Sequence, residues 1–116
     1  MYMASAVYDM MDVYTRGPDR VGPAYGYNSA LVQATNAASL PQSAWKDARI
    51  RASYNPDDQT VPPQQHAIAL ESLAGPVATE TSFITHDGGG TATGHTVPGW
   101  ANKDMLLTFQ RWAGLS

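Results

Sequence analysis

The sequence predicts an α/β fold in which two parallel strands alternate with helices. Two observations support it: an alternating segment at residues 48–54 and an apolar segment at residues 80–86, each followed by a segment with helical spacing. Strands separated by helices return in the same direction through right-handed crossovers, so they are expected to run parallel. Because two such strands make a poor sheet alone, we expect the chain to dock against another chain or to belong to a larger sheet.

Residues 1–44 are predicted to be a helical lead-in. Residues spaced by three and four predict an amphipathic helix that ends before Gly17-Pro18: Met3, Val7, Met10, Met11 and Tyr14. A second, short helix is expected after Asn28 or Ser29, either of which can cap it, and Pro41 marks its limit.

Residues 45–116 are predicted to form an α/β subdomain that begins with a strand at residues 48–54. There the chain reads ARIRASY, with Ile50, Ala52 and Tyr54 on one side and the two arginines and Ser53 on the other. Arginines are unusual in a central parallel strand, so they imply either an edge position or an internal salt bridge.

The rest of the subdomain alternates helix, strand and helix. A turn at residues 55–58 leads to a helix opened by Pro62-Pro63 and closed at Gly75-Pro76, and His66 in its first turn is expected to be solvated. A strand at residues 80–86 precedes a glycine-rich loop at residues 87–99. Asn102 is expected to cap the last helix, which has one apolar face: Met105, Leu106, Phe109, Trp112 and Ala113.

Composition excludes several classes of function. The chain has 116 residues, a formal net charge of -3 and only seven scattered Lys and Arg, so we expect neither nucleic acid nor a membrane as partner. Without cysteine it has no disulfide framework, thiolate metal site or catalytic thiol, and no cofactor is expected. No basic leader or long apolar run predicts a signal peptide or a membrane span, so a soluble protein is expected.

Two loops carry the residues with candidate chemistry. Asp57 and Asp58 follow the first strand, and His86 and His95 follow the second. Because the carboxyl ends of parallel strands share one edge of a sheet, a carboxylate and an imidazole are expected to meet there. That pair is what a serine hydrolase uses to activate its nucleophile. We predict Asp58 and His95 as the pair, with Asp57 and His86 as alternatives. The structural interpretation is a turn carboxylate that caps the helix after Pro62 and a loop histidine that is hydrogen-bonded locally.

The two loops resemble those of a known family. Asp58-Gln59-Thr60-Val61-Pro62 resembles the acid loop of α/β-hydrolases, and Gly94-His95-Thr96-Val97-Pro98-Gly99 resembles the histidine loop of esterases with that fold. Residues 45–116 carry the resemblance, and the stretch before them is similar to esterase-like hydrolases of actinobacteria and their phages. The resemblance implies the C-terminal part of a parallel α/β-hydrolase sheet, incomplete alone, with Asp58 as acid and His95 as base.

The family's nucleophile motif, G-x-S-x-G, is absent from the sequence. None of the serines has flanking glycines in that pattern: Ser5, Ser29, Ser39, Ser43, Ser53, Ser72, Ser82 and Ser116. The chain is therefore expected to be inactive alone and to need a partner polypeptide that carries the serine and the N-terminal half of the fold. The alternative is a non-catalytic structural or interaction protein, such as a phage virion or tail component.

Overall fold

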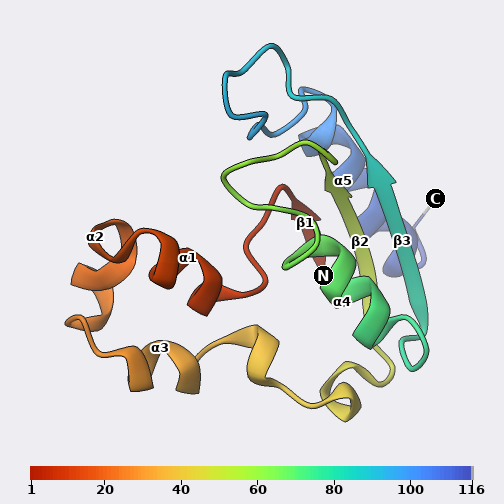
Figure 1. Ribbon diagram of the computed structural model, residues 1–116. Helices are drawn as coiled ribbons and strands as arrows, with labels where there is room; N and C mark the ends of the chain where they lie inside the picture. The colour runs from red at the N-terminus through yellow and green to blue at the C-terminus, as the bar shows by residue number, and fades with distance from the viewer. Residues whose placement is uncertain (116) are drawn as a thin grey trace.

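The computed structural model describes residues 1–115 and contains one sheet of three parallel strands (Figure 1). The strands are β1 (Tyr2–Ala4), β2 (Arg49–Tyr54) and β3 (Glu80–Thr85), in the order β1-β2-β3. Residue Ala52 of β2 lies beside Met3 of β1 and Phe83 of β3. The parallel direction of the two expected strands is confirmed, and β1 is an additional strand.

Five helices and three short 3-10 segments connect and cover the strands within residues 1–115. The helices are α1 (Met10–Arg16), α2 (Pro18–Val21), α3 (Ser29–Ala34), α4 (Ala67–Ala74) and α5 (Ala101–Trp112). The 3-10 segments are η1 (Gly22–Tyr25), η2 (Ala37–Ser39) and η3 (Gln42–Trp45). Helices α4 and α5 lie on opposite faces of the sheet, and α1, α2 and α3 form a lobe beside it (Figure 1).

The first segment differs from the predicted single helix. Residues 2–4 pair with β2, and the chain then turns at Ser5, whose φ of 52° lies in the left-handed region. Helix α1 begins only at Met10, where the Asp9 carboxylate accepts hydrogen bonds from the backbone N–H groups of Met11 and Asp12. The stripe of apolar residues is thus divided between a strand and a helix. The division of the chain at residue 45 stays a prediction, although β1 joins the same sheet as the later strands.

Because side chains alternate along β2, they lie on the two opposite faces of the sheet. Ile50 is fully buried and packs with Leu70 and Ala74 of α4 and with Tyr8 in the core cluster. On the opposite face, Arg51 forms two hydrogen bonds with Asp104 of α5, at 2.6 and 2.8 Å. The strand is central among the three, so the edge position is wrong and the salt bridge is confirmed.

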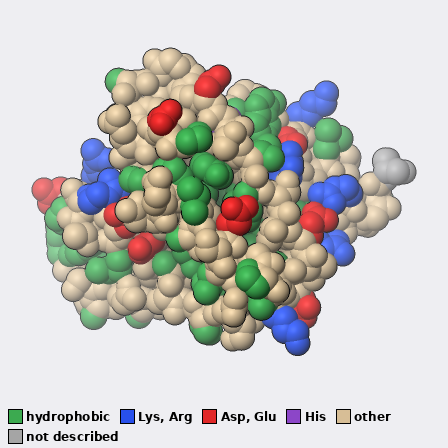
Figure 2. Space-filling view, turned by 45° about the vertical axis from the view of Figure 1, so that its right-hand side comes forward, with side chains coloured by type: hydrophobic (Ala, Val, Ile, Leu, Met, Phe, Trp, Pro, Cys, Tyr) green, Lys and Arg blue, Asp and Glu red, His purple; other side chains and the backbone are tan. Residues whose placement is uncertain are grey.

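Helix α5 begins two residues earlier than predicted and packs through a different face. Trp100, not Asn102, stands at its N-cap position, and Trp100 forms no side-chain capping bond. Its buried residues are Ala101 and Thr108, whereas four of the predicted apolar residues are exposed: Met105, Leu106, Phe109 and Ala113. The apolar side chains of α5 therefore remain largely outside the core. Hydrophobic side chains also reach the surface at several places in Figure 2.

Candidate functional site

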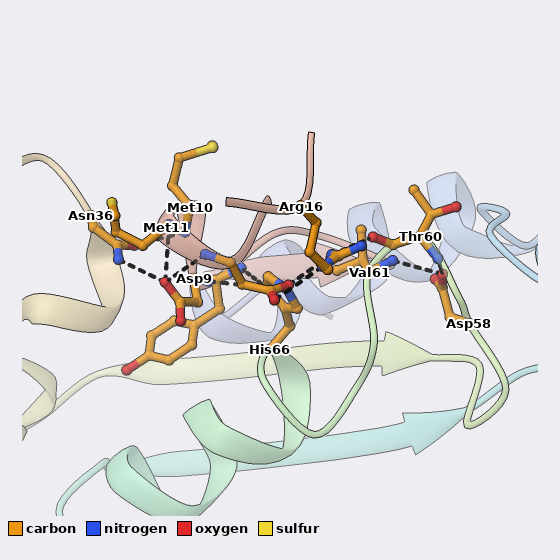
Figure 3. Close-up of polar contacts among 11 residues, drawn as sticks. Asp9, Met10, Met11, Arg16, Asn36, Asp58, Thr60, Val61 and His66 are labelled. Atoms are coloured by element: carbon orange, nitrogen blue, oxygen red, sulfur yellow. Dashed lines mark hydrogen bonds and ion pairs between the residues drawn. The ribbon is translucent and has the colours of Figure 1, made fainter. Parts of the chain in front are cut away.

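Asp58 occupies the loop after β2 and uses its two carboxylate oxygens for different purposes. One oxygen accepts hydrogen bonds from the backbone N–H groups of Thr60 and Val61, both at 2.9 Å (Figure 3). The other lies 2.8 Å from Nδ1 of His95. The residue is only 5% exposed. Asp58 is therefore both a turn carboxylate and the partner of a histidine, but it caps no helix, because α4 begins only at Ala67.

His95 comes from the loop after β3, and its ring is open on one side. Because an ionised carboxylate only accepts hydrogen bonds, the contact with Asp58 places the ring proton on Nδ1 and leaves the lone pair on Nε2. Within residues 1–115 Nε2 has no hydrogen-bond partner, and the side chain is 36% exposed. The imidazole is therefore oriented by a buried carboxylate and free to accept a proton from a group brought to it.

The loop that carries His95 is attached to the loop that carries Asp58. The Asn55 side chain donates to the Gly94 carbonyl at 2.9 Å, and the Gln59 N–H donates to the Thr93 carbonyl at 2.8 Å. Gly94 has a φ of 74°, and a Cβ there would lie 2.7 Å from the Asn55 side-chain nitrogen. Only glycine fits this approach. Asn55 is a buried residue that the sequence analysis missed, although Asn-Pro after a strand is a turn signal.

The alternative base, His86, belongs to a separate cluster. Its Nε2 lies 3.1 Å from Ser5 Oγ and 3.2 Å from the Thr96 carbonyl oxygen, to which Ser5 also donates at 2.5 Å. His86 Nδ1 is buried without a partner among residues 1–115, so no carboxylate orients this ring. Ser5 and His86 thus hold the peptide next to His95, and neither residue contacts Asp58.

The alternative acid, Asp57, is exposed in the turn. Its backbone N–H donates to the Asn55 side chain, and its carboxylate forms no hydrogen bond within the described chain. Asp58 therefore contacts His95, whereas neither Asp57 nor His86 takes part in a carboxylate–imidazole contact within the described chain. The catalytic roles of Asp58 and His95 stay predictions.

His66 is buried rather than solvated, so the expectation for this residue is wrong. It is 1% exposed, and its Nδ1 accepts hydrogen bonds from the N–H groups of Tyr8 and Asp9, both at 3.0 Å. Nε2 then carries the proton and donates to Asp12 at 2.9 Å (Figure 3). The segment between β1 and α1 covers the start of α4, and a prediction that made this segment part of a helix could not anticipate that contact.

Asp12, which His66 binds, also forms an ion pair with Arg16. The two residues form hydrogen bonds of 3.0 and 2.7 Å, and the guanidinium also donates to the Thr60 carbonyl at 2.9 Å (Figure 3). The hydrogen bonds from Arg16, and then that from His66, hold the pKa of Asp12 below its ordinary value although burial acts in the opposite direction. Arg16 is thereby fixed against the loop that contains Asp58.

A pocket of about 300 Å³ opens beside His95. Its walls include Val13 and Val21 from the helical lobe and Val61 from the acid loop, together with Arg16 and Arg20. The pocket therefore combines apolar walls, two guanidinium groups and the imidazole that Asp58 orients. A ligand with both an apolar and an anionic part fits this lining.

Residues 1–115 contain no group of three His, Asp or Glu side chains placed to hold a metal ion. None of the helices described is both long enough and apolar enough to span a bilayer.

Comparison with known proteins adds no assignment. No protein family, no curated protein and no solved structure matches the chain.

Proposed function

We propose that this chain supplies the acid and the base of a Ser-His-Asp triad whose serine lies on another polypeptide. The observation that carries the proposal is the 2.8 Å contact between His95 Nδ1 and the buried Asp58, with His95 in the lining of the pocket and its Nε2 without a partner within residues 1–115. In such a triad the imidazole takes the serine proton during attack and returns it to the leaving group. The carboxylate fixes the tautomer and stabilises the imidazolium. The reaction would be hydrolysis of an ester.

The order of the elements supports an incomplete α/β-hydrolase sheet as the setting. Asp58 follows β2, α4 intervenes, His95 follows β3, and α5 closes the chain. In an open parallel sheet such loops lie at the carboxyl ends of adjacent strands, where ligands bind. Within this proposal the missing strands and the nucleophile elbow belong to the partner, which pairs along the sheet.

The test is co-expression with a partner encoded by a neighbouring reading frame that contains strands followed by G-x-S-x-G. The assembled pair should hydrolyse a short-chain nitrophenyl ester, and this chain alone should not. His95→Ala should abolish the activity, because no other base faces the substrate. Asp58→Asn should lower kcat by about 10⁴-fold through the wrong tautomer, whereas Asp57→Asn, a matched control one position away, should change it little. Turnover by the single chain, or activity unchanged in His95→Ala, would contradict the proposal.

The second candidate is a non-catalytic structural or interaction protein, such as a virion or tail component. The observation that favours it is the apolar surface of α5, where Leu106 is 58% and Leu107 is 53% exposed. This candidate expects a stable, stoichiometric assembly that shows no hydrolysis of the nitrophenyl ester. Activity that depends on His95 in the assembled pair would exclude it.

A further inference from the structure

The pocket beside His95 contains an unequal pair of arginines. Arg16 has its guanidinium engaged by the Asp12 carboxylate and the Thr60 carbonyl. Arg20 is exposed and lines the same pocket, and its side chain forms no hydrogen bond or ion pair with any residue from 1 to 115. The guanidinium group of Arg20 is therefore unpaired at the pocket, whereas that of Arg16 is held in place.

The nearest carboxylates are engaged elsewhere. Asp12 is shared by Arg16 and the buried His66, and Asp58 is shared by His95 and two backbone N–H groups. Asp19 lies next to Arg20 in the sequence, but its carboxylate accepts a hydrogen bond from the Tyr27 hydroxyl at 3.3 Å. The positive charge of Arg20 is thus the one at this pocket without a carboxylate partner within the described chain.

The residues that line the pocket indicate what kind of ligand it binds. Guanidinium groups bind carboxylates through two parallel N–H donors, and such charge-assisted bonds are stronger than neutral ones. The apolar walls formed by Val13, Val21 and Val61 suit a short methylene chain. A carboxylate on Arg20 would leave the rest of a short ligand near the His95 ring, since both residues line one cavity.

We infer that this pocket binds a carboxylate carried by the substrate, and that the substrate class is a monoester of a short dicarboxylic acid. Arg20 is the residue that determines this specificity, and Arg16, held by Asp12 and His66, is the positioning residue at its side. The assignment of the substrate rests on the proposed function. The binding of a carboxylate does not, because it needs neither the serine nor turnover.

The binding test uses the full chain with succinate as the probe. Succinate should shift the ring signals of His95 and the backbone amide of Val61 in a saturable NMR titration, and succinamide, a neutral analogue of the same shape, should not. Arg20→Gln should weaken succinate binding about tenfold, because it removes a charge-assisted contact. Lys46→Gln removes the same charge from an exposed residue that precedes the opposite end of β2 and should leave binding unchanged.

Because Arg20 is exposed, Arg20→Gln should keep the wild-type amide spectrum away from the pocket, and Arg20→Lys should restore part of the binding. Equal titrations with succinate and succinamide, or equal binding by wild type and Arg20→Gln, would overturn the inference. Binding of inorganic phosphate without binding of succinate would overturn the choice of carboxylate. If the chain binds succinate but the assembled pair hydrolyses no ester, the triad proposal is wrong and the carboxylate site stands. If the pair hydrolyses the ester but the chain does not bind succinate, the carboxylate site is wrong and the triad proposal stands.

Discussion

Asp58 joins local folding to the candidate chemistry within one side chain. The oxygen that accepts from Thr60 and Val61 closes the turn, and the oxygen that faces His95 orients the ring. A carboxylate buried to this extent needs several partners to offset its desolvation, and here it has three. The role in the turn and the role beside the histidine are thus compatible rather than competing.

Asp58→Asn should separate the two roles. The amide oxygen can still accept from Thr60 and Val61, so we expect a loss of stability of only about 1 kcal/mol. The amide nitrogen would instead donate to His95 Nδ1, which moves the ring proton to Nε2. Nitrogen-15 spectra of the His95 ring should therefore report the opposite tautomer. Asp58→Ala removes both contacts and should cost about 2 kcal/mol or more. An unchanged tautomer in Asp58→Asn would show that the carboxylate does not orient the ring.

At this scale the sequence predicted the pair and missed what surrounds it. Asp58 and His95 could be predicted because residues after adjacent parallel strands meet at one edge. His66 and Ser5 could not, because their contacts depend on how the first 16 residues fold. Asn55 could not, because its partner Gly94 lies 39 positions away in another loop. A buried, fully bonded histidine and a solvated one have the same sequence signal.

The first 16 residues show why element boundaries were harder to predict than element types. A spacing of three and four residues predicts a helix, but three of these residues instead complete a parallel ladder with β2. Ser5 ends that ladder with a φ of 52°, and its hydroxyl donates to the Thr96 carbonyl. Pairing with a distant strand thus overrides the local pattern.

Polar contacts attach α5 to the sheet in place of a continuous apolar interface. Arg51 and Asp104 form a partly exposed pair, and the Tyr2 hydroxyl also donates to Asp104 at 2.8 Å. Burial and the Asp104 carboxylate raise the pKa of Tyr2 to about 12. Farther along the helix, Arg111 and the Trp112 indole donate to the Glu80 carboxylate of β3.

Glu80 should make the attachment of α5 sensitive to acid. Hydrogen bonds from Arg111 and Trp112 lower the pKa of Glu80 from 4.5 to about 2. A carboxylate whose pKa is lower in the folded state stabilises that state above pH 4.5, and the contribution disappears as the pH falls to about 2. The midpoint of thermal unfolding of the wild type should therefore exceed that of Glu80→Gln at pH 6 and converge with it near pH 2.

The size of this effect should be small, because the pair is exposed to solvent. Glu71→Gln is the matched control, since Glu71 is exposed on α4 and its side chain forms no hydrogen bond within residues 1–115. Its difference from the wild type should not vary with pH. If the midpoint of thermal unfolding of Glu80→Gln differs from that of the wild type equally at pH 6 and pH 2, the lowered pKa of Glu80 is not the cause of the difference.

For the whole molecule, the unusual feature is how much apolar surface stays outside the core. The core cluster contains four buried residues, Tyr8, Ile50, Leu70 and Ala74. Several large apolar side chains of α5 are meanwhile exposed: Met105, Leu106, Leu107 and Phe109. A sheet of three short strands with a small core and an uncovered helix fits a piece that is completed by another surface. That the fold is incomplete stays a prediction from its strands, and the sequence could not predict which side of α5 would be exposed.

The isolated chain should therefore self-associate, and substitutions on α5 should reduce that tendency. In sedimentation experiments, Leu106→Gln combined with Leu107→Gln should shift the wild-type association toward monomer without loss of secondary structure, because both side chains are already exposed. Leu31→Gln is the control, as Leu31 is 44% exposed on α3 and away from α5. A wild-type chain that remains a stable monomer at high concentration would count against both candidate functions.

The chain of contacts from His66 through Asp12 to Arg16 has a practical consequence for anyone who wants to alter ligand preference. The imidazole of His66 is almost fully buried, yet it binds the same carboxylate that holds the Arg16 guanidinium at the pocket. Libraries of variants should consequently keep His66, Asp12 and Arg16 unchanged together. Diversity is best introduced at Arg20, Val13 and Val21, which line the pocket without being buried in the core.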